Sequence, residues 1–341
     1  MILAGDIGGT TTTLAALDGD LARASMIFES YLSREHAQFG EILELFLHQH
    51  PLAVDACCVG VAGPVRNQRC AVTNLPWIVD GEEIAGLAGI EEAWLLNDLE
   101  AVGFGIEVLE PHEILELQAG EPQAKGHRAV IAAGTGLGEA GLFWDGSAHS
   151  PFASEGGHGD FAPSDELEIE LLRFLLREHA RVSWERVVSG PGLANLYRFL
   201  RDSGRFAADS EPAAIADEMR TGDPAAVISR CAAAGTSPLC ARALSLFMKL
   251  YGAEAGNLAL EMMATGGLYV GGGIASKNLD WLRSGPFIEA FLAKGRMRPL
   301  LEAIPVRLLL NDQTGLLGAA RCAHLRWQRS AHSTRSLRSP G

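Results

Sequence analysis

The sequence predicts an α/β protein built from two domains. Its 341 residues exceed one ordinary domain, and length alone favours two. Residues 1–108 alternate short apolar strands with helical segments, which is typical of an α/β domain. Beyond Pro163, helical segments dominate. We therefore expect a small α/β domain from residues 1–108 and 312–328, and a large α/β domain with added helices from residues 109–311.

Composition bounds the kind of partner. With 48% hydrophobic and 21% charged residues, the chain has the composition of a soluble globular protein. Its 28 basic and 42 acidic residues give a net charge of −14, which argues against nucleic acid as the main partner. This acidity is sufficiently explained by solubility. An anionic substrate would need a local site, because the overall field repels it.

The cysteines and the first residues bear on the compartment. The six cysteines form no CxxC pair and have no zinc-ligand spacing, so we expect reduced, unpaired thiols. Residues 1–20 show no charged n-region followed by a long apolar stretch, and no run of about 18 apolar residues occurs. We expect a cytoplasmic protein without a membrane span.

The first half of the chain reads as strands around one clear helix. Met1–Gly5 and Thr12–Leu17 are predicted strands of a hairpin whose turn is rich in glycine. Four apolar residues spaced i, i+3, i+4, i+7 predict a helix with one buried face: Phe39, Ile42, Leu43 and Phe46. Two further buried strands are predicted at Ala56–Val61 and Ala93–Leu96.

The second half is predicted to be mostly helical. Its strands are predicted at Val130–Ala133, Leu268–Val270 and Val306–Leu310. Its helices are predicted at 165–179, 211–220, 224–234, 239–264 and from Thr314 to about Arg326. Residues 329–341 are polar, and we expect a disordered tail there. Residues 2–17 and 129–143 are two similar glycine-ended strand units, which hints at duplicated halves.

Two glycine turns could hold phosphate. Asp6-Ile7-Gly8-Gly9-Thr10 places a carboxylate at a strand end, beside backbone N–H groups that can point at phosphate oxygens. The carboxylate could also hold Mg²⁺, directly or through water. Gly134-Thr135-Gly136-Leu137-Gly138 offers the same kind of turn. Tight hairpins use glycine for structural reasons too, so each turn taken alone leaves both interpretations open.

Other nucleotide and hydrolase signatures are excluded. Gly136, Gly138 and Gly141 satisfy GxGxxG, but the dinucleotide fingerprint requires a helix to open inside the motif. Here Gly141–Trp144 reads as a strand that ends in the Asp145-Gly146 turn, so we reject a dehydrogenase. The chain contains neither GxxxxGK[ST] nor GxSxG, which excludes a P-loop kinase and a hydrolase nucleophile elbow.

Three polar groups are candidates for substrate chemistry. Asp98 follows Asn97 at the end of a buried strand, where it could accept a proton from a substrate hydroxyl, although either residue could simply cap the next helix. Glu155 and His158 lie in a glycine-rich stretch, which favours a loop that binds a polyol over a helical metal site. Glu185, considered alone, would pass as a surface residue.

Taken in order, these pieces resemble the bacterial glucokinases of the actin/hexokinase/Hsp70 ATPase superfamily. The resemblance runs from about residue 2 to residue 325. It depends on the stretches at 5–10, 96–98, 133–138, 155–158, 185–192 and 271–274, together with the closing signature at 311–318. The resemblance implies two actin/hexokinase-like (ribonuclease H-like) domains flanking a cleft, and homodimers are common in such a family.

The resemblance also implies a role for each site residue. Asp98 would be the catalytic base for the 6-hydroxyl of glucose, and four residues would bind the other hydroxyls: Asn97, Glu155, His158 and Glu185. Asp6 would serve Mg²⁺. The phosphates of ATP would lie against two turns: Gly8, Gly9 and Thr10 in one, and Gly134, Thr135 and Gly136 in the other. Gly271, Gly272 and Gly273 would line the adenosine pocket.

Two alternatives stay beside the glucokinase interpretation. One is a kinase for another hexose, or one that uses a polyphosphate donor. The other is a non-catalytic sugar-binding regulator on the same fold, for which we would expect an added DNA-binding segment or a lost base. The chain departs from the family pattern at Thr11 and Thr13, where an Asn and an Arg often stand.

Overall fold

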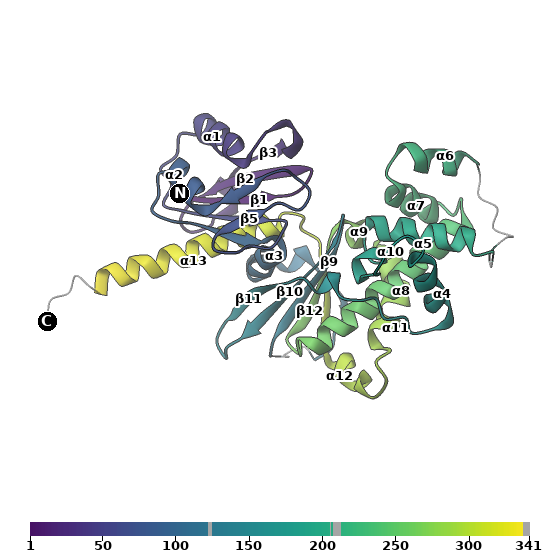
Figure 1. Ribbon diagram of the computed structural model, residues 1–341. Coiled ribbons are helices and arrows are strands. Elements are labelled where there is room, and N and C mark those ends of the chain that lie inside the picture. The colour runs from purple at the N-terminus through teal and green to yellow at the C-terminus, as the bar shows by residue number, and fades with distance from the viewer. Residues whose placement is uncertain (122–124, 205, 207–212, 337–341) are drawn as a thin grey trace. The chain divides into compact units, whose positions relative to one another are not determined.

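The computed structural model describes residues 1–121, 125–204, 206 and 213–336. By their internal contacts these residues divide into two compact units. Unit 1 comprises Met1–Pro111, Ser150–Ala153 and the chain from Asn311, and unit 2 comprises His112–His149 and Ser154–Leu310. The predicted boundaries, after residues 108 and 311, lie within three residues of these. Each unit contains one sheet covered by helices (Figure 1).

Unit 1 is built on a five-stranded sheet in the order β3-β2-β1-β4-β7. Its strands are β1 (Ile2–Ile7), β2 (Thr11–Leu17), β3 (Ile27–Leu32), β4 (Ala56–Val61) and β7 (Ala93–Asn97). The first three pair antiparallel, whereas β1, β4 and β7 run parallel. The parallel strands are continuous apolar runs because helices cover both of their faces.

Helices cover the two faces of this sheet with different residues. On one face α1 (Phe39–Gln49) and α2 (Gly81–Ala88) share an apolar core with the odd-numbered residues of β1. On the other face α3 (Asp98–Gly105) and α13 (Thr314–Ser336) pack against the even-numbered ones. This alternation follows from the two-residue period of a strand. A small hairpin, β5 (Arg69–Ala71) with β6 (Ile78–Asp80), completes the unit.

Unit 2 is built on a six-stranded sheet in the order β11-β10-β9-β12-β13-β8. Its strands are β8 (Ile114–Gln118), β9 (Arg128–Ala133), β10 (Leu137–Trp144), β11 (His149–Ser154), β12 (Gly267–Gly271) and β13 (Val306–Leu309). Residues Ser150–Ala153 of β11 are the ones that group with unit 1. Strand β9 pairs antiparallel with β10 and parallel with β12, which pairs parallel with β13. The turn between β9 and β10 is the second predicted glycine turn.

The helices of unit 2 surround α8 (Pro238–Glu261), which packs against β9 and β12. Figure 1 shows α4, α5 and α7 gathered beside α8. Their bounds, with those of the remaining helices, are α4 (Glu166–Leu175), α5 (Gly190–Asp202), α6 (Ala213–Thr221), α7 (Pro224–Ala233), α9 (Gly273–Lys277), α10 (Leu279–Arg283), α11 (Pro286–Leu292) and α12 (Arg298–Ala303). Helix α8 is buried around most of its circumference, and its residues Leu244, Phe247 and Tyr251 are completely buried.

The two sheets repeat one strand order. The run β2-β1-β4-β7 in unit 1 has the same mix of one antiparallel and two parallel pairings as β10-β9-β12-β13 in unit 2. The first hairpin turn of each run is a glycine turn. The similarity between residues 2–17 and 129–143 therefore corresponds to equivalent positions in two sheets of like topology.

Some element ends differ from the predictions. The last helix, predicted to end near Arg326, continues to Ser336, so residues 329–336 are helical where a disordered tail was expected. Residues 337–341 lie outside the described residues, as do residues 211 and 212 of the predicted helix at 211–220. Helix α4 ends at Leu175 instead of residue 179, because the next residues form turns in place of the regular i to i−4 ladder.

In the part of the chain that the structure describes, every helix is too short or too polar to cross a bilayer.

Candidate active site

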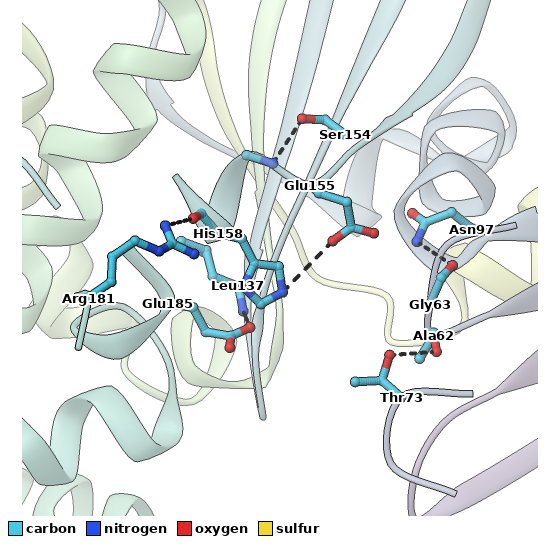
Figure 2. Close-up of polar contacts among 11 residues, drawn as sticks. Ala62, Gly63, Thr73, Asn97, Leu137, Ser154, Glu155, His158, Arg181 and Glu185 are labelled. Carbon is cyan, nitrogen blue, oxygen red and sulfur yellow. Dashed lines mark hydrogen bonds and ion pairs between the residues drawn. The ribbon is translucent and has the colours of Figure 1, made fainter. Parts of the chain in front are cut away.

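In unit 1, α3 begins at the predicted base. Asn97 is the N-cap of this helix, and its side-chain oxygen accepts hydrogen bonds from the N–H groups of Leu99 (3.0 Å) and Glu100 (3.4 Å). Its amide donates to the carbonyl oxygen of Gly63 at 3.3 Å (Figure 2). The capping alternative is therefore correct for Asn97. The N-cap role is thereby filled, so Asp98 is not needed for it.

Asp98 is the first residue of α3 and is partly exposed. Its Oδ1 accepts a hydrogen bond from the N–H of Leu99 at 2.9 Å. The positive end of the helix dipole stabilises a carboxylate at this position, which favours the ionised form that a base requires. Asp98 thus has the charge and the exposure of a general base.

Asp6 lies at the end of β1, partly buried, against the start of α13. A Cβ atom built on Gly315 would lie 3.5 Å from Asp6 Oδ2, so the carboxylate faces the first turn of that helix. Burial raises the pKa of Asp6 to about 6. A desolvated carboxylate favours an added positive charge, and a bound Mg²⁺ would supply one.

The first glycine turn is held by hydroxyl groups and close packing. The N–H of Gly8 donates to the Thr11 carbonyl at 3.0 Å, and the Ser33 hydroxyl donates to the Gly8 carbonyl at 2.9 Å. A Cβ on Gly9 would lie 2.9 Å from the Asn74 Cβ, which no real side chain tolerates. Thr13, where the family often has Arg, lies with its hydroxyl 3.0 Å from that of Ser30.

In unit 2, the turn between β9 and β10 opens into a cavity. The cavity has a volume of about 840 Å³, within the range of small-molecule sites. Its wall contains Gly134 and Thr135 of the turn, the first residues of α5 and α7, and Gly273 at the start of α9. The rest of the lining is mainly small and apolar, with four charged or polar side chains beyond the helix starts: Ser229, Arg230, Lys277 and Asn278.

Three helix N-termini therefore meet at this cavity, and each start is fixed locally. Ser189 caps α5 by accepting from the Gly192 N–H, and Asp223 caps α7 by accepting from the Ala225 N–H. Gly272 precedes α9 with a φ of 85°, a conformation that favours glycine, and a Cβ there would lie 2.3 Å from the Ala133 carbonyl. Helix N-termini favour anions, so the cavity has polarity suited to phosphate groups.

The predicted adenosine residues divide between the wall and the layer behind it. Gly273 lines the cavity, whereas Gly271 and Gly272 lie against the ends of neighbouring strands. The phenol of Tyr251, fully buried on α8, accepts from the Ala133 N–H at 3.1 Å. It also lies within donating distance of the Ile131 (3.2 Å) and Gly271 (3.0 Å) carbonyls. Tyr251 thus joins the end of β9, where the Gly134–Gly136 turn begins, to the end of β12, where the Gly271–Gly273 stretch begins. The sequence did not reveal this role.

Glu185 is bound to the same glycine turn. Its Oε2 accepts a hydrogen bond from the Leu137 N–H at 3.1 Å (Figure 2). A Cβ on Gly136 would lie 2.5 Å from that oxygen, so the carboxylate could not keep this position beside a larger residue at 136. Glu185, which the resemblance assigns to the sugar, therefore lies beside the turn that lines the cavity.

Glu155 and His158 flank a short 3-10 turn, Gly156–His158, at the end of β11. His158 Nε2 and Glu155 Oε2 are 3.9 Å apart, and both side chains are more than half exposed. Arg181 donates to the carbonyl oxygen of His158 at 2.6 Å, and Ser154 accepts from the Gly156 N–H at 3.0 Å (Figure 2). The loop thus presents one carboxylate and one imidazole, while its backbone is anchored from both sides.

The structure therefore groups the predicted residues within each unit. Unit 1 holds Asp6, the Gly8–Thr10 turn, Asn97 and Asp98, and unit 2 holds Gly134–Gly136, Glu155, His158, Glu185 and the Gly271–Gly273 stretch. Within unit 2 the phosphate turn and Glu185 are in direct contact. Carboxylates, an imidazole and a cavity lined by helix N-termini are features that phosphoryl transfer to a hydroxyl compound can use.

Comparison with known proteins shows which family has this sequence and fold. The glucokinase family profile matches residues 3–326. A glucokinase from Nostoc sp. is 44% identical over 337 residues, which cover 95% of this chain and 98% of the relative. A glucokinase crystal structure from an Antarctic psychrotroph has a TM-score of 0.79 and 31% identity, over 95% of this chain and 98% of that one.

A third comparison supports the fold. The structure of a ROK family glucokinase from Streptomyces griseus in complex with glucose and AMPPNP has a TM-score of 0.65, over 95% of this chain and 99% of that one. At 20% identity this similarity concerns architecture, which in these sugar kinases is two-domain and actin/hexokinase-like. Taken with the family match and the relative from Nostoc, the conclusion is that the chain belongs to the glucokinase family.

Proposed function

We propose that the chain transfers the γ-phosphoryl group of ATP to the 6-hydroxyl of glucose. One observation carries the proposal: the β9–β10 turn both lines the 840 Å³ cavity and holds the Glu185 carboxylate. A single backbone element thereby serves a site for an anionic nucleotide and a site for a hydroxyl-rich acceptor. The family membership, and the AMPPNP and glucose bound by the Streptomyces relative, support the same pair of substrates.

ATP is proposed to occupy the cavity of unit 2. The alanines and prolines of its wall suit a purine ring, and the helix starts and Gly134–Thr135 suit the phosphates. Gly8–Thr10 of unit 1 is proposed as the second phosphate turn, because its backbone is fixed in advance by Ser33. Preorganised N–H groups stabilise phosphate charge without reorganisation during the reaction.

Glucose is proposed to bind Glu155, His158, Glu185 and Asn97. Sugar hydroxyls both donate and accept hydrogen bonds, and this set contains carboxylate acceptors, an amide and an imidazole. Asp98 is proposed as the general base, which orients the 6-hydroxyl and takes its proton as the oxygen attacks phosphorus. General base catalysis contributes about 10²–10⁴-fold to such reactions.

Mg²⁺ is proposed to bind at Asp6. The carboxylate is desolvated and has no basic side chain among its recorded hydrogen bonds or ion pairs, which fits a cation held by one carboxylate together with substrate phosphates. When bound, the cation would neutralise phosphate charge. Gly315 leaves the space beside Asp6 Oδ2 open, and a Cβ atom there would lie in ordinary van der Waals contact with the carboxylate, 3.5 Å from Oδ2.

The setting proposed for this activity is a cytoplasmic homodimer that does not bind nucleic acid. All six cysteines are buried and lie outside any disulfide in the described residues, which suits a reducing compartment. The net charge of −14 disfavours nucleic acid. Light scattering coupled to size exclusion would test the dimer, and a mass of one chain, 36.3 kDa, would contradict it.

The test of the function is an assay of glucose 6-phosphate formation from ATP, Mg²⁺ and glucose. Mannose, fructose, N-acetylglucosamine and a polyphosphate donor would be run beside it. We expect turnover with glucose and ATP far above the other pairs. Turnover with a different hexose would overturn the proposed sugar, and glucose binding without turnover for any pair would favour the non-catalytic regulator.

A further inference from the structure

The carboxyl group of Glu139 lies against the loop Glu155–His158, called the sugar loop below because it holds two proposed glucose ligands. Glu139 has no part in the function proposed so far. Glu139 is on β10, two residues after Leu137 and therefore on the same face of the strand. Its residue is 2% exposed, and its Oε1 is buried without a hydrogen-bond partner among the described residues. A buried carboxyl group with an unpartnered oxygen is costly and calls for an explanation.

The group that faces Glu139 is another carboxyl group. Glu254 of α8, itself 6% exposed, lies within hydrogen-bonding reach of it. Asn257 donates to Glu254 Oε2 at 2.8 Å, and Lys294 donates to Asn257 Oδ1 at 2.5 Å and to the Ala253 carbonyl at 2.8 Å. Two facing carboxylates repel one another, so the pair is stable only when it retains a proton.

The electrostatics of the site agree with this. Burial is the main cause that raises the pKa of Glu139 to about 8, with the charges of Glu254 and Glu261 adding to it. Burial also raises the pKa of Glu254 to about 7, and the Asn257 hydrogen bond and the charge of Lys294 oppose the rise. At neutral pH the pair therefore keeps at least one proton between its two carboxyl groups.

The backbone of the sugar loop rests directly on this strand face. A Cβ atom on Gly156 would lie 1.9 Å from Glu139 Oε2, and a Cβ on Gly157 would lie 2.1 Å from the Leu137 carbonyl. The glycines therefore bring the main chain of the loop into contact with Glu139 and Leu137. Glu155 and His158, the two proposed sugar ligands, stand immediately before and after this contact.

We propose that Glu139 is a positioning residue for glucose. Its carboxyl group shares a proton with that of Glu254 and contacts Gly156, and this contact holds Glu155 and His158 in position. This inference rests on the proposed function, because it assigns the loop to the sugar. Ionisation of both carboxyl groups places an uncompensated negative charge in the buried space beside Gly156 and displaces the loop from its contact with Glu139. The consequence is weaker glucose binding in alkaline solution, with nucleotide binding unchanged.

The test compares the parent protein with the variants Glu139→Gln and Glu139→Ala. For each, the KM for glucose and the KM for ATP are measured from pH 6.5 to pH 9.5. In the parent protein we expect the glucose KM to rise above about pH 8, following the ionisation of Glu139. Glu139→Gln keeps the shape and cannot ionise, so its glucose KM should stay flat over this range. Glu139→Ala removes the side chain that contacts Gly156. Its glucose KM at pH 7.5 should rise roughly tenfold or more while the ATP KM changes little.

Glu168→Gln is the matched control for loss of a buried carboxylate. Glu168 is 1% exposed and bonds Ser164, without touching the sugar loop. We expect this variant to lower thermal stability without an effect on the glucose KM. If Glu139→Ala fails to fold, Gly156→Ala and the pH profile of Glu139→Gln still decide the matter, because a methyl group at 156 displaces the loop from the same contact.

Two results would overturn the proposal. One is a Glu139→Ala protein with the glucose KM of the parent, and the other is an alkaline rise that persists in Glu139→Gln. Failure of the proposed function has a different signature: the parent protein itself would neither bind nor phosphorylate glucose at any pH.

Discussion

At the scale of single residues, the start of α3 divides two tasks between neighbours. Asn97 accepts the hydrogen bonds of the helix start, and Asp98 keeps a carboxylate that is partly exposed at the positive end of the helix. Asp98 Oδ1 is also fixed by the Leu99 N–H. The carboxylate is therefore oriented before any substrate binds.

Asp98→Asn should separate chemistry from binding. The amide keeps the shape of the side chain and its acceptor for the Leu99 N–H, but it cannot take a proton. We expect kcat to fall by at least about 10²–10⁴-fold and the glucose dissociation constant to stay near that of the parent. Steady-state kinetics and calorimetry would measure the two. Asn97→Ala removes both the helix cap and a proposed glucose ligand, so it should instead cost about 1 kcal/mol of stability and weaken glucose binding. A kcat near normal in Asp98→Asn would refute the base.

Asp6 predicts a pH-dependent demand for Mg²⁺. Burial raises its pKa to about 6, so the carboxyl group is largely ionised at pH 7.5 and largely protonated at pH 5.5. A cation at Asp6 must displace that proton, and the Mg²⁺ concentration for half-maximal activity should therefore rise several-fold between these pH values. Titration of Mg²⁺ at fixed ATP would show it. Asp6→Asn should have a high and pH-independent requirement, and an unchanged profile in that variant would contradict the assignment.

At the scale of elements, the close approach of α3 and α13 depends on glycine. A Cβ on Gly318 would lie 1.8 Å from the Ala101 carbonyl, and a Cβ on Gly105 would lie 2.0 Å from the Thr314 carbonyl. The two helices thus pack backbone to backbone. One begins at Asp98 and the other begins beside Asp6, so their crossing fixes both carboxylates of unit 1.

Tyr251 has the corresponding role in unit 2. Tyr251→Phe removes a hydroxyl that no water can replace in a fully buried position, and it leaves the Ala133 N–H unsatisfied. We expect a loss of about 1–3 kcal/mol in the free energy of unfolding, with a higher ATP KM because both turns at the nucleotide cavity loosen. Chemical denaturation and kinetics would measure these effects. Tyr269→Phe, in which the tyrosine lies on β12 beside Arg307, is the control. An unchanged ATP KM in Tyr251→Phe would mean that the hydroxyl serves stability alone.

Sequence patterns predicted the elements better than the layer behind the site. Strands β1, β4, β7, β9 and β12 are mainly apolar runs, and each was predicted within about three residues. Tyr251, Glu139 and Glu254 lie in stretches that read as ordinary core helix and strand. Their roles depend on contacts across the fold, such as those of Tyr251 with Ala133 and of Glu139 with Glu254, which no local pattern encodes.

Local patterns also misjudged the end of the last helix. Residues 329–336 contain serine, histidine and arginine in place of an apolar stripe, so the sequence predicted disorder there. The helix nevertheless continues to Ser336. Extension of an established helix adds one hydrogen bond per residue without a new nucleation cost, so polar residues can continue it.

At the scale of the whole molecule, the two units repeat one strand arrangement, and different substrate-binding roles are proposed for each. Each has an antiparallel hairpin with a glycine turn beside parallel strands, and in each the turn is the proposed phosphate contact. What differs is the added polar equipment: Asp6 and Asp98 in unit 1, and the carboxylates and helix starts around the cavity in unit 2.

The same carboxyl groups make stability depend on pH throughout the chain. Burial raises the pKa values of Asp6 to about 6, Glu254 to about 7 and Glu139 to about 8, above the ordinary values of 3.8 and 4.5. A group whose pKa is higher in the folded chain contributes stability that is complete below its unfolded pKa and is lost as the pH rises through its folded pKa. These three groups therefore weaken the folded state between about pH 4 and pH 8.

We expect hydrogen exchange to reveal that loss where the groups lie. Peptides that contain β10 and the middle of α8 should exchange faster at pH 8.5 than at pH 6.5 after correction for intrinsic rates, by an amount on the order of a few kcal/mol at most. In Glu139→Gln the difference should shrink in these peptides, whereas peptides around Asp6 should show little difference in either protein, because the pKa of Asp6 is about 6 and its carboxyl group is already largely ionised at pH 6.5. Equal protection at both pH values in the parent protein would mean that Glu139 and Glu254 ionise without strain, and the shared proton would then have no part in holding the fold.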